Sequence, residues 1–171
     1  MGKRALILMG MGAGAGWALA AIPLSRQVSW HVKMPLVDAM AWSLLPCGIV
    51  LLLMIGRLAQ RRFFDDAIID GEPYQEGSAA EIDQRVLRNS VEQLVLNLTL
   101  WPFIGLTLGA GPVLLLGASF GVTRLLFWLG YHISSPLRAF GFAAGFYPTI
   151  TLLALALVIA VEDWRFASLT G

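Results

Sequence analysis

Two short segments of the chain combine basic, amide and carboxylate side chains at spacings that a helix would bring together. In the first segment, Arg85, Arg88, Asn89 and Glu92 stand at positions i, i+3, i+4 and i+7. Residues with these separations lie on one face of an α-helix. Guanidinium groups bind carboxylates through paired hydrogen bonds, and amides add further donors. This face therefore predicts a charged pocket, in which the function of the protein should be sought.

In the second segment, Arg124, Phe127 and Tyr131 stand at positions i, i+3 and i+7, with Gly130 beside them. These three side chains share a helix face, and the glycine permits close approach of another backbone. Arg124 lies about two turns inside a predicted membrane span, where it needs a polar partner. Glu92 of the first segment is the carboxylate that we expect it to pair with.

A helix start follows directly, in the sequence Ser134-Ser135-Pro136-Leu137-Arg138. Ser135 is the predicted N-cap and Pro136 the first helical residue, because serine and proline favour these positions. Arg138 then falls in the first turn, where a cation opposes the helix dipole. A helix N-terminus that also carries a guanidinium group predicts an anion site.

These polar residues also have a purely structural interpretation. Three arginines fit cationic anchors that extend to lipid headgroups: Arg85, Arg88 and Arg138. An Arg124–Glu92 pair between helices would serve folding alone. Anchoring explains Asn89 and Glu92 poorly, because a carboxylate one turn inside hydrocarbon gains nothing by extending along the helix.

The elements that must position these residues are those of a membrane protein. Of the 171 residues, 57% are hydrophobic and only 13% are charged, whereas soluble domains average about 25% charged residues. A net charge of +1 without a basic tract excludes a nucleic-acid partner from the prediction. The single cysteine allows no intrachain disulfide, and the two distant histidines predict no metal site.

Five apolar runs of about 20 residues or more could each cross roughly 30 Å of hydrocarbon. They are Ala5–Leu24, Leu36–Leu58, Arg88–Leu108, Pro112–His132 and Leu137–Val161. The third run continues a polar helix that begins near Ala80. The sequence therefore predicts an all-α membrane protein with five spans.

The first run has features of a signal peptide, with a basic start and a small-residue motif at Ala18-Leu19-Ala20. We expect it to be a retained helix instead. Its four alternating glycines offer a strip of small residues for close helix packing: Gly10, Gly12, Gly14 and Gly16.

The distribution of positive charge predicts the orientation of the spans. Most arginine and lysine residues fall on one side of a five-span topology: Lys3, Arg4, Arg57, Arg61, Arg62, Arg85 and Arg138. The opposite side has only Arg26, Lys33 and Arg165. Because cytoplasmic loops carry the excess of positive charge, the first group is predicted to be cytoplasmic. The longest loop, residues 60–79, lies on the same side.

The two polar segments resemble those of the MAPEG family, the membrane-associated proteins in eicosanoid and glutathione metabolism. This family includes microsomal glutathione transferases and the glutathione-dependent leukotriene and prostaglandin synthases. Its second-helix pattern is matched by Arg85, Asn89 and Glu92, with Arg88 at an additional basic position. Its third-helix pattern and the arginine that follows are matched by Arg124, Phe127, Gly130, Tyr131 and Arg138. The resemblance covers about Leu36–Val161.

The resemblance implies four helices per subunit, a homotrimer, and glutathione bound between neighbouring subunits near the cytoplasmic face. Residues 36–171 would form the four-helix MAPEG-like domain, and residues 1–35 an additional N-terminal transmembrane helix with an outer loop. The protein would be an integral, multi-pass protein of a bacterial-type inner membrane, in contact with membrane lipid. Its active face would be cytoplasmic.

The implied activity is that of a glutathione transferase or peroxidase that acts on lipophilic electrophiles or peroxides. Glutathione would be the co-substrate, with no metal. Arg138 matches the family arginine associated with thiolate activation. The implied glutathione-binding residues are Arg85, Arg88, Asn89, Glu92, Arg124 and Tyr131, with Arg61 or Arg62.

The sequence departs from the family pattern at two positions and leaves other functions open. Phe127 replaces a tyrosine that lines the site, and Gln93 replaces an aromatic residue, so the second substrate is not implied. A non-catalytic protein that binds a lipid or thiol in the same cleft is the alternative. A channel or transporter is disfavoured, because its polar residues would span the full bilayer depth rather than cluster at one face.

Overall fold

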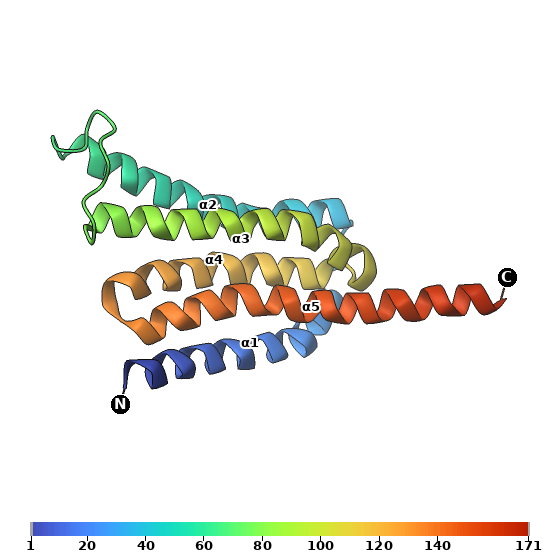
Figure 1. Cartoon of the computed structure of the whole chain (residues 1–171). Coiled ribbons are helices and arrows are strands. Elements are labelled where there is room, and N and C mark those ends of the chain that lie inside the picture. Colours follow the sequence, from blue (N-terminus) through green and yellow to red (C-terminus); the bar gives the residue numbers. More distant parts are fainter. Residues whose placement is uncertain (1, 171) are drawn as a thin grey trace.

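The fold is described from a computed structural model for residues 2–170, with side chains up to Phe166. It consists of five helices in sequence order (Figure 1). They are α1 (Lys3–His31), α2 (Leu36–Phe63), α3 (Ala79–Leu108), α4 (Ala110–Ile133) and α5 (Ser135–Thr170). No strand occurs within residues 2–170.

The five predicted spans are confirmed, because each helix is long and apolar enough to cross a membrane. The polar start of α3 is set by local capping. Ser78 Oγ accepts a hydrogen bond from the Glu81 backbone N–H at 3.1 Å, which satisfies one donor of the first turn. The link between the third and fourth spans is a single residue, Gly109. Its φ of 92° lies in the region that favours glycine.

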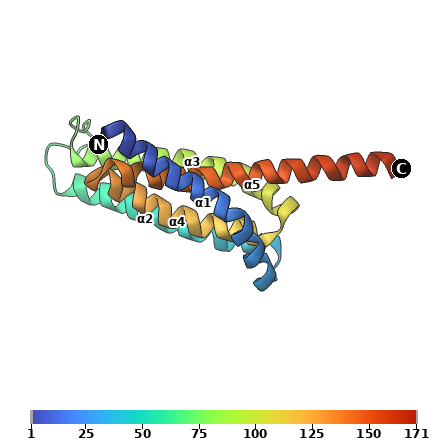
Figure 2. The ribbon, with the colours of Figure 1, turned by 90° about the horizontal axis from the view of Figure 1, so that it is seen from below.

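Helix α4 lies at the centre of the bundle and packs against all four other helices. Helix α2 packs against α3 and α4. Helix α1 lies on the side of the bundle away from α2 (Figure 1), so that it lies in front in the view from below (Figure 2), and it packs only against α5 and α4. Helices α1 and α3 therefore flank α4 and α5 without touching each other.

Glycines allow α1 to approach α5 at backbone distance. A Cβ atom added at Gly10 would collide with the carbonyl oxygen of Pro136, and one at Gly14 would lie 2.9 Å from the backbone nitrogen of Ala144. These two glycines confirm the predicted close packing of the first helix. Gly12 and Gly16 have no atom within 4 Å of an added Cβ, so only half of the predicted strip lies at the interface.

One end of the bundle, which we call the loop end, carries the long loop 64–78 between α2 and α3. The start of α1 and the turn between α4 and α5 lie at the same end (Figure 1). All of the arginines predicted to share a side belong to helix segments at the loop end: Arg4, Arg57, Arg61, Arg62, Arg85 and Arg138. The charged site must therefore be sought there.

Candidate functional site

A cavity of about 590 Å³ opens at the loop end of the bundle and is lined by four helices. It brings the two polar segments together. The first segment lies on α3, whereas the second segment and the arginine that follows it lie on α4 and α5. The lining residues are Ile7 and Met11 from α1, Arg85, Arg88, Asn89 and Glu92 from α3, Phe127 and Tyr131 from α4, and Arg138, Ala139 and Phe142 from α5.

The α3 wall of this cavity is the face predicted from the i, i+3, i+4, i+7 spacing. Arg85, Arg88 and Glu92 are exposed in the single chain, and Asn89 is half-buried. Arg85 is held in place one turn back, where its Nη2 donates to Glu81 Oε1 at 2.6 Å. The wall thus presents two guanidinium groups, an amide and a carboxylate on one helical surface.

The opposite part of the polar surface joins α4 to the first turn of α5. The guanidinium of Arg138 lies over the Tyr131 ring, 4.9 Å from its centroid. The Tyr131 ring in turn meets Phe127 edge-to-face at 5.2 Å. A Cβ at Gly130 would collide with the backbone of Arg138, so the glycine allows the contact that brings Arg138 to the cavity.

The start of α5 differs by one residue from the prediction. The helix begins at Ser135, and the carbonyl oxygen of Ser134 accepts from the Arg138 N–H at 3.1 Å. Ser134 therefore precedes the helix where Ser135 was predicted to cap it, and Pro136 is the second helical residue rather than the first. Arg138 remains in the first turn, as predicted.

Arg124 does not line the cavity, and the predicted pair with Glu92 is wrong. Its side chain is fully buried. Its Nη1 donates to Asn89 Oδ1 at 3.0 Å, and its Nη2 donates to the carbonyl oxygen of Gly141 at 3.1 Å. The missing side chain of Gly145 provides the space, because a Cβ there would lie 2.8 Å from Nη2.

Aromatic rings complete the surroundings of the buried guanidinium. Arg124 Cζ lies 4.5 Å from the ring centroid of Phe127 and 5.5 Å from that of Phe120. The cation is stabilised by ring faces and neutral oxygens rather than by a carboxylate. Glu92 is thereby left on the exposed surface of α3, facing the cavity.

The hydrogen bond from Arg124 also fixes the orientation of the Asn89 amide. A guanidinium can only donate, so the atom that meets it must be the amide oxygen. The amide nitrogen of Asn89 keeps its two donors, and Asn89 lines the cavity. Arg124 thus acts as a positioning residue that makes Asn89 a hydrogen-bond donor to the cavity.

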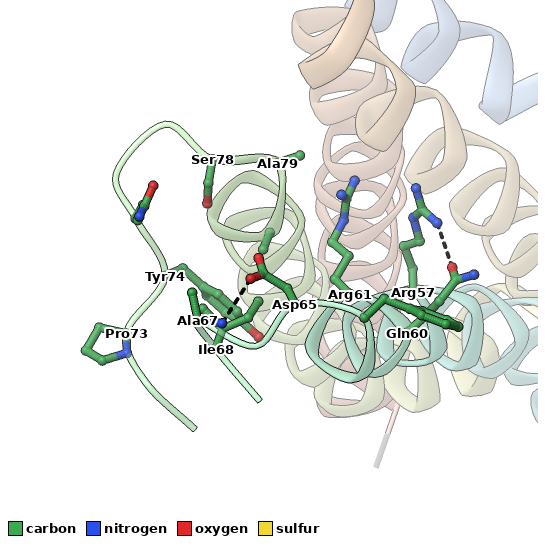
Figure 3. Close-up of a pocket in the computed structure, with 13 residues that line it drawn as sticks. Arg57, Gln60, Arg61, Asp65, Ala67, Ile68, Pro73, Tyr74, Ser78 and Ala79 are labelled. Carbon is green, nitrogen blue, oxygen red and sulfur yellow. Dashed lines mark hydrogen bonds between the residues drawn. The ribbon is translucent and has the colours of Figure 1, made fainter. Parts of the chain in front are cut away.

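Arg61 and Arg62 lie elsewhere within the chain. Arg61 lines a second cavity of about 620 Å³ between the end of α2 and the loop 64–78, near Arg57 and Tyr74 (Figure 3). Arg62 donates from Nε to the Tyr74 hydroxyl at 2.7 Å and from Nη1 to the carbonyl oxygen of Ile68 at 3.3 Å. A single chain therefore does not bring either arginine to the charged cavity.

Asp83 forms a polar junction that we did not single out from the sequence. Its carboxylate is 2% exposed and accepts from Arg61 Nε at 2.6 Å and from Trp128 Nε1 at 2.7 Å. His132 Nε2 lies 2.8 Å from the same carboxylate. The junction links α2, α3 and α4 beside the site. The signal was helical spacing, which puts Asp83 on one face of α3 with Ala80, Val86 and Ser90, and this face is buried.

The apolar lining residues were also missed, and for these the sequence carries no signal. Ile7, Met11, Ala139 and Phe142 stand in apolar runs where nearly every residue is equally apolar. Only the packing of α1 and α5 in the bundle places these four side chains at the cavity.

Membrane-length helices around a charged cavity at one end are the features of a small multi-pass membrane protein. The model of the MAPEG family matches residues 39–158, which is most of the 171-residue chain. The chain therefore belongs to the MAPEG family. The match begins within α2 and ends within α5, and α1 lies outside it. Neither a search of curated proteins nor a search of solved structures gave a match.

Proposed function

We propose that this protein is an integral membrane glutathione transferase or peroxidase that activates the glutathione thiol for attack on lipophilic electrophiles or peroxides. One observation carries the proposal: Arg138 and Tyr131 face the same cavity as the charged surface of α3. MAPEG membership supports the same chemistry.

The groups in the cavity fit the chemistry of glutathione, which has two carboxylates, one ammonium group and a thiol. Arg85 and Arg88 suit the carboxylates, and Glu92 suits the ammonium group. The free N–H donors of Asn89 add a hydrogen bond to an anionic group. The cavity volume of about 590 Å³ lies within the range of roughly 300–1,000 Å³ typical of small-molecule sites.

Arg138 is the proposed catalytic residue. A free thiol with a pKa near 8.5 is only about 3% ionised at pH 7. A fall of that pKa to about 6.5 would give roughly 75% thiolate, a change worth about 2.7 kcal/mol. A guanidinium in the first turn of α5 adds its charge to the positive end of the helix dipole. Both favour the thiolate over the thiol.

The proposed reaction with an electrophile joins the whole glutathionyl group to the acceptor carbon. The thiol proton goes to solvent, the thiolate attacks an electrophilic carbon, a C–S bond forms, and the leaving group departs with its electron pair. With a peroxide, the thiolate attacks the terminal oxygen, an S–O bond forms as the O–O bond breaks, and the products are a sulfenic acid and an alcohol. A second glutathione then forms the disulfide, releasing water. Because a lower pKa also reduces the nucleophilicity of sulfur, positioning must supply much of the rate.

The proposed assembly follows from the family and from charge. Helices α2 to α5, within residues 36–171, would form the four-helix MAPEG bundle, and residues 1–35 would add α1. Glu92 is exposed on α3 in the single chain, and a second copy of the chain would cover it. We therefore favour a homotrimer with glutathione between subunits. In such a trimer, Arg61 or Arg62 of one subunit would contact the glutathione bound at a neighbouring subunit and not the glutathione at its own cavity. The excess of arginine at the loop end favours a cytoplasmic active face, in a bacterial-type inner membrane.

The test is a binding and turnover measurement on the purified protein. Isothermal titration calorimetry should show saturable binding of glutathione. Conjugation of glutathione to a chlorinated dinitrobenzene should then proceed above the uncatalysed rate. Binding without turnover of this acceptor or of an organic hydroperoxide would instead support the non-catalytic lipid- or thiol-binding alternative. Absence of binding would reject the proposal.

A further inference from the structure

The charged cavity has two walls of opposite chemistry. On α3 the lining residues are charged or amide side chains, whereas on α1 they are Ile7 and Met11. Their separation of four residues places both on one face of α1. No charged or amide side chain of α1 lines the cavity. A ligand that fills the cavity therefore meets charge on one side and only hydrocarbon and thioether surface on the other.

The position of the apolar wall is fixed by backbone contact rather than by side chains alone. Gly10 and Gly14 place the α1 backbone against the start of α5, where an added Cβ would meet backbone atoms of α5. Such a contact leaves α1 little freedom to rotate about its axis. Ile7 and Met11 lie on the side of this contact that faces the cavity and are half-buried. Leu8 and Met9 point elsewhere and are 66% and 57% exposed.

The space between the two walls is a groove. Helices α1 and α3 do not touch, so the cavity separates them, and α4 and α5 form its floor. The floor itself is mixed, with Phe127, Ala139 and Phe142 as apolar residues and Tyr131 and Arg138 as polar ones, and Ala139 lies against α1 beside Gly10. The polarity of the site thus changes across the groove, from α3 to α1.

We infer that α1 supplies the binding site for the lipophilic acceptor, with Ile7 and Met11 as specificity-determining residues. This inference rests on the proposed function, since it places glutathione on the α3 side and the acceptor on the α1 side. The thiolate held by Arg138 would then face the apolar half of the groove. Because α1 lies outside the matched MAPEG residues, the acceptor wall is an addition of this chain to the family site.

S-alkyl glutathiones test the inference, because each joins the polar ligand to an apolar chain of chosen length. We would measure the affinities of glutathione and of its S-methyl, S-hexyl and S-decyl derivatives by calorimetry on the full-length protein. The affinity of the wild-type protein should rise by up to about fourfold for each methylene that the apolar wall buries. Glutathione itself reports the polar half alone.

The decisive variant is Met11→Trp, with Met9→Trp as its matched control on the exposed side of α1. Met11→Trp should fill the apolar half and lower the affinity for the S-hexyl and S-decyl derivatives by about tenfold or more. Glutathione, which carries no alkyl chain, should lose less affinity than either derivative. Met9→Trp should leave all four affinities unchanged. If Met11→Trp does not fold, Met11→Ala should lower the gain per methylene instead.

The outcomes separate the inference from the proposed function. If the wild-type protein binds glutathione but gains nothing from the alkyl chain, the acceptor does not use α1. The same conclusion follows if substitutions at positions 11 and 9 act alike. If the wild-type protein binds none of the four compounds, the proposed function fails, and the acceptor site fails with it.

Discussion

Asn89 shows how a buried cation determines what a neighbouring amide can do. Its oxygen is committed to Arg124, so its nitrogen is the part available to a ligand. The buried arginine and the arginines that line the cavity are therefore proposed to have different tasks. Arg124 positions a neutral donor, whereas Arg85, Arg88 and Arg138 supply charge.

Asn89→Asp tests this division. The new carboxylate should pair with Arg124 and preserve the fold, but it removes the N–H donors and adds a negative charge. We expect glutathione affinity to fall by about 1.5–3 kcal/mol, or roughly 10- to 150-fold, as for loss of a hydrogen bond to a charged group. The melting temperature should not decrease. Unchanged affinity in calorimetry would show that the amide nitrogen does not meet the ligand.

Arg138→Ala should abolish thiolate formation while leaving the assembly intact. The ultraviolet difference absorbance of the bound thiolate measures this directly, at glutathione concentrations that saturate the variant. Arg57→Ala is the matched control, since Arg57 is an exposed arginine at the same end that bonds Gln60 and lines the other cavity. An Arg138→Ala protein with the wild-type thiolate signal would remove Arg138 from the mechanism.

Packing between helices explains which predictions were confirmed and which were wrong. Each span could be recognised because its apolar run is long, and the α3 face could be recognised because helical spacing is fixed within one element. The Arg124–Glu92 pair depended on how α4 rotates against α3 and α5. Sequence spacing does not determine that rotation. Here α5 leaves space for Arg124 at Gly145, and the carbonyl oxygen of Gly141 accepts a hydrogen bond from its guanidinium.

Ile7 and Met11 illustrate a second limit. Their contribution to the site comes from the groove between α1 and α3, and apolar side chains on a membrane helix look alike whether they face lipid, protein or ligand. Asp83 is different. A buried carboxylate needs donors, and its place on the buried face of α3 indicated that partners from other helices would meet it.

The junction at Asp83 should hold α2, α3 and α4 together. Asp83→Asn retains one acceptor oxygen but loses the charge that Arg61 meets at 2.6 Å. We expect a loss of about 1.5–3 kcal/mol of folding stability, seen as a lower melting temperature in detergent. Glu81→Gln, at the exposed Arg85 pair, should cost no more than about 0.5 kcal/mol. Equal effects of the two substitutions would show that the junction is not structural.

The packing contact between α1 and α5 can be tested by substitution of two glycines of α1. Gly10→Leu places a side chain where even a Cβ collides with the Pro136 carbonyl, whereas Gly12→Leu projects into open space. We expect Gly10→Leu to lower the melting temperature and to expose α1 to protease. Gly12→Leu should match the wild-type protein in both measurements. Equal resistance of the two variants would show that α1 is not fixed by this contact.

The exposed charge on α3 bears on the assembly. Glu92 lies on a helix of membrane-spanning length and is exposed in the single chain. Placing a charged side chain in hydrocarbon costs roughly 2.5–3.5 kcal/mol or more. A neighbouring protomer that covers α3 would remove that cost and complete the site.

We therefore expect native mass spectrometry in mild detergent to give three times the chain mass of 18.6 kDa. Glu92→Leu is an informative comparison. It should retain the trimer, since an apolar side chain suits a helix interface, but weaken glutathione binding. A monodisperse monomer that still binds glutathione would show that one chain forms the complete site.

The gap between α1 and α3 has a consequence for kinetics. If α1 forms the acceptor wall, a lipophilic acceptor partitions into the bilayer before it reaches the groove, so the relevant concentration is the mole fraction of acceptor among lipids. Adding empty vesicles at a fixed total amount of acceptor should then slow the reaction, although nothing in the aqueous phase has changed. Adding the same volume of buffer should have almost no effect. Rates for this protein would have to be reported per unit of membrane rather than per litre.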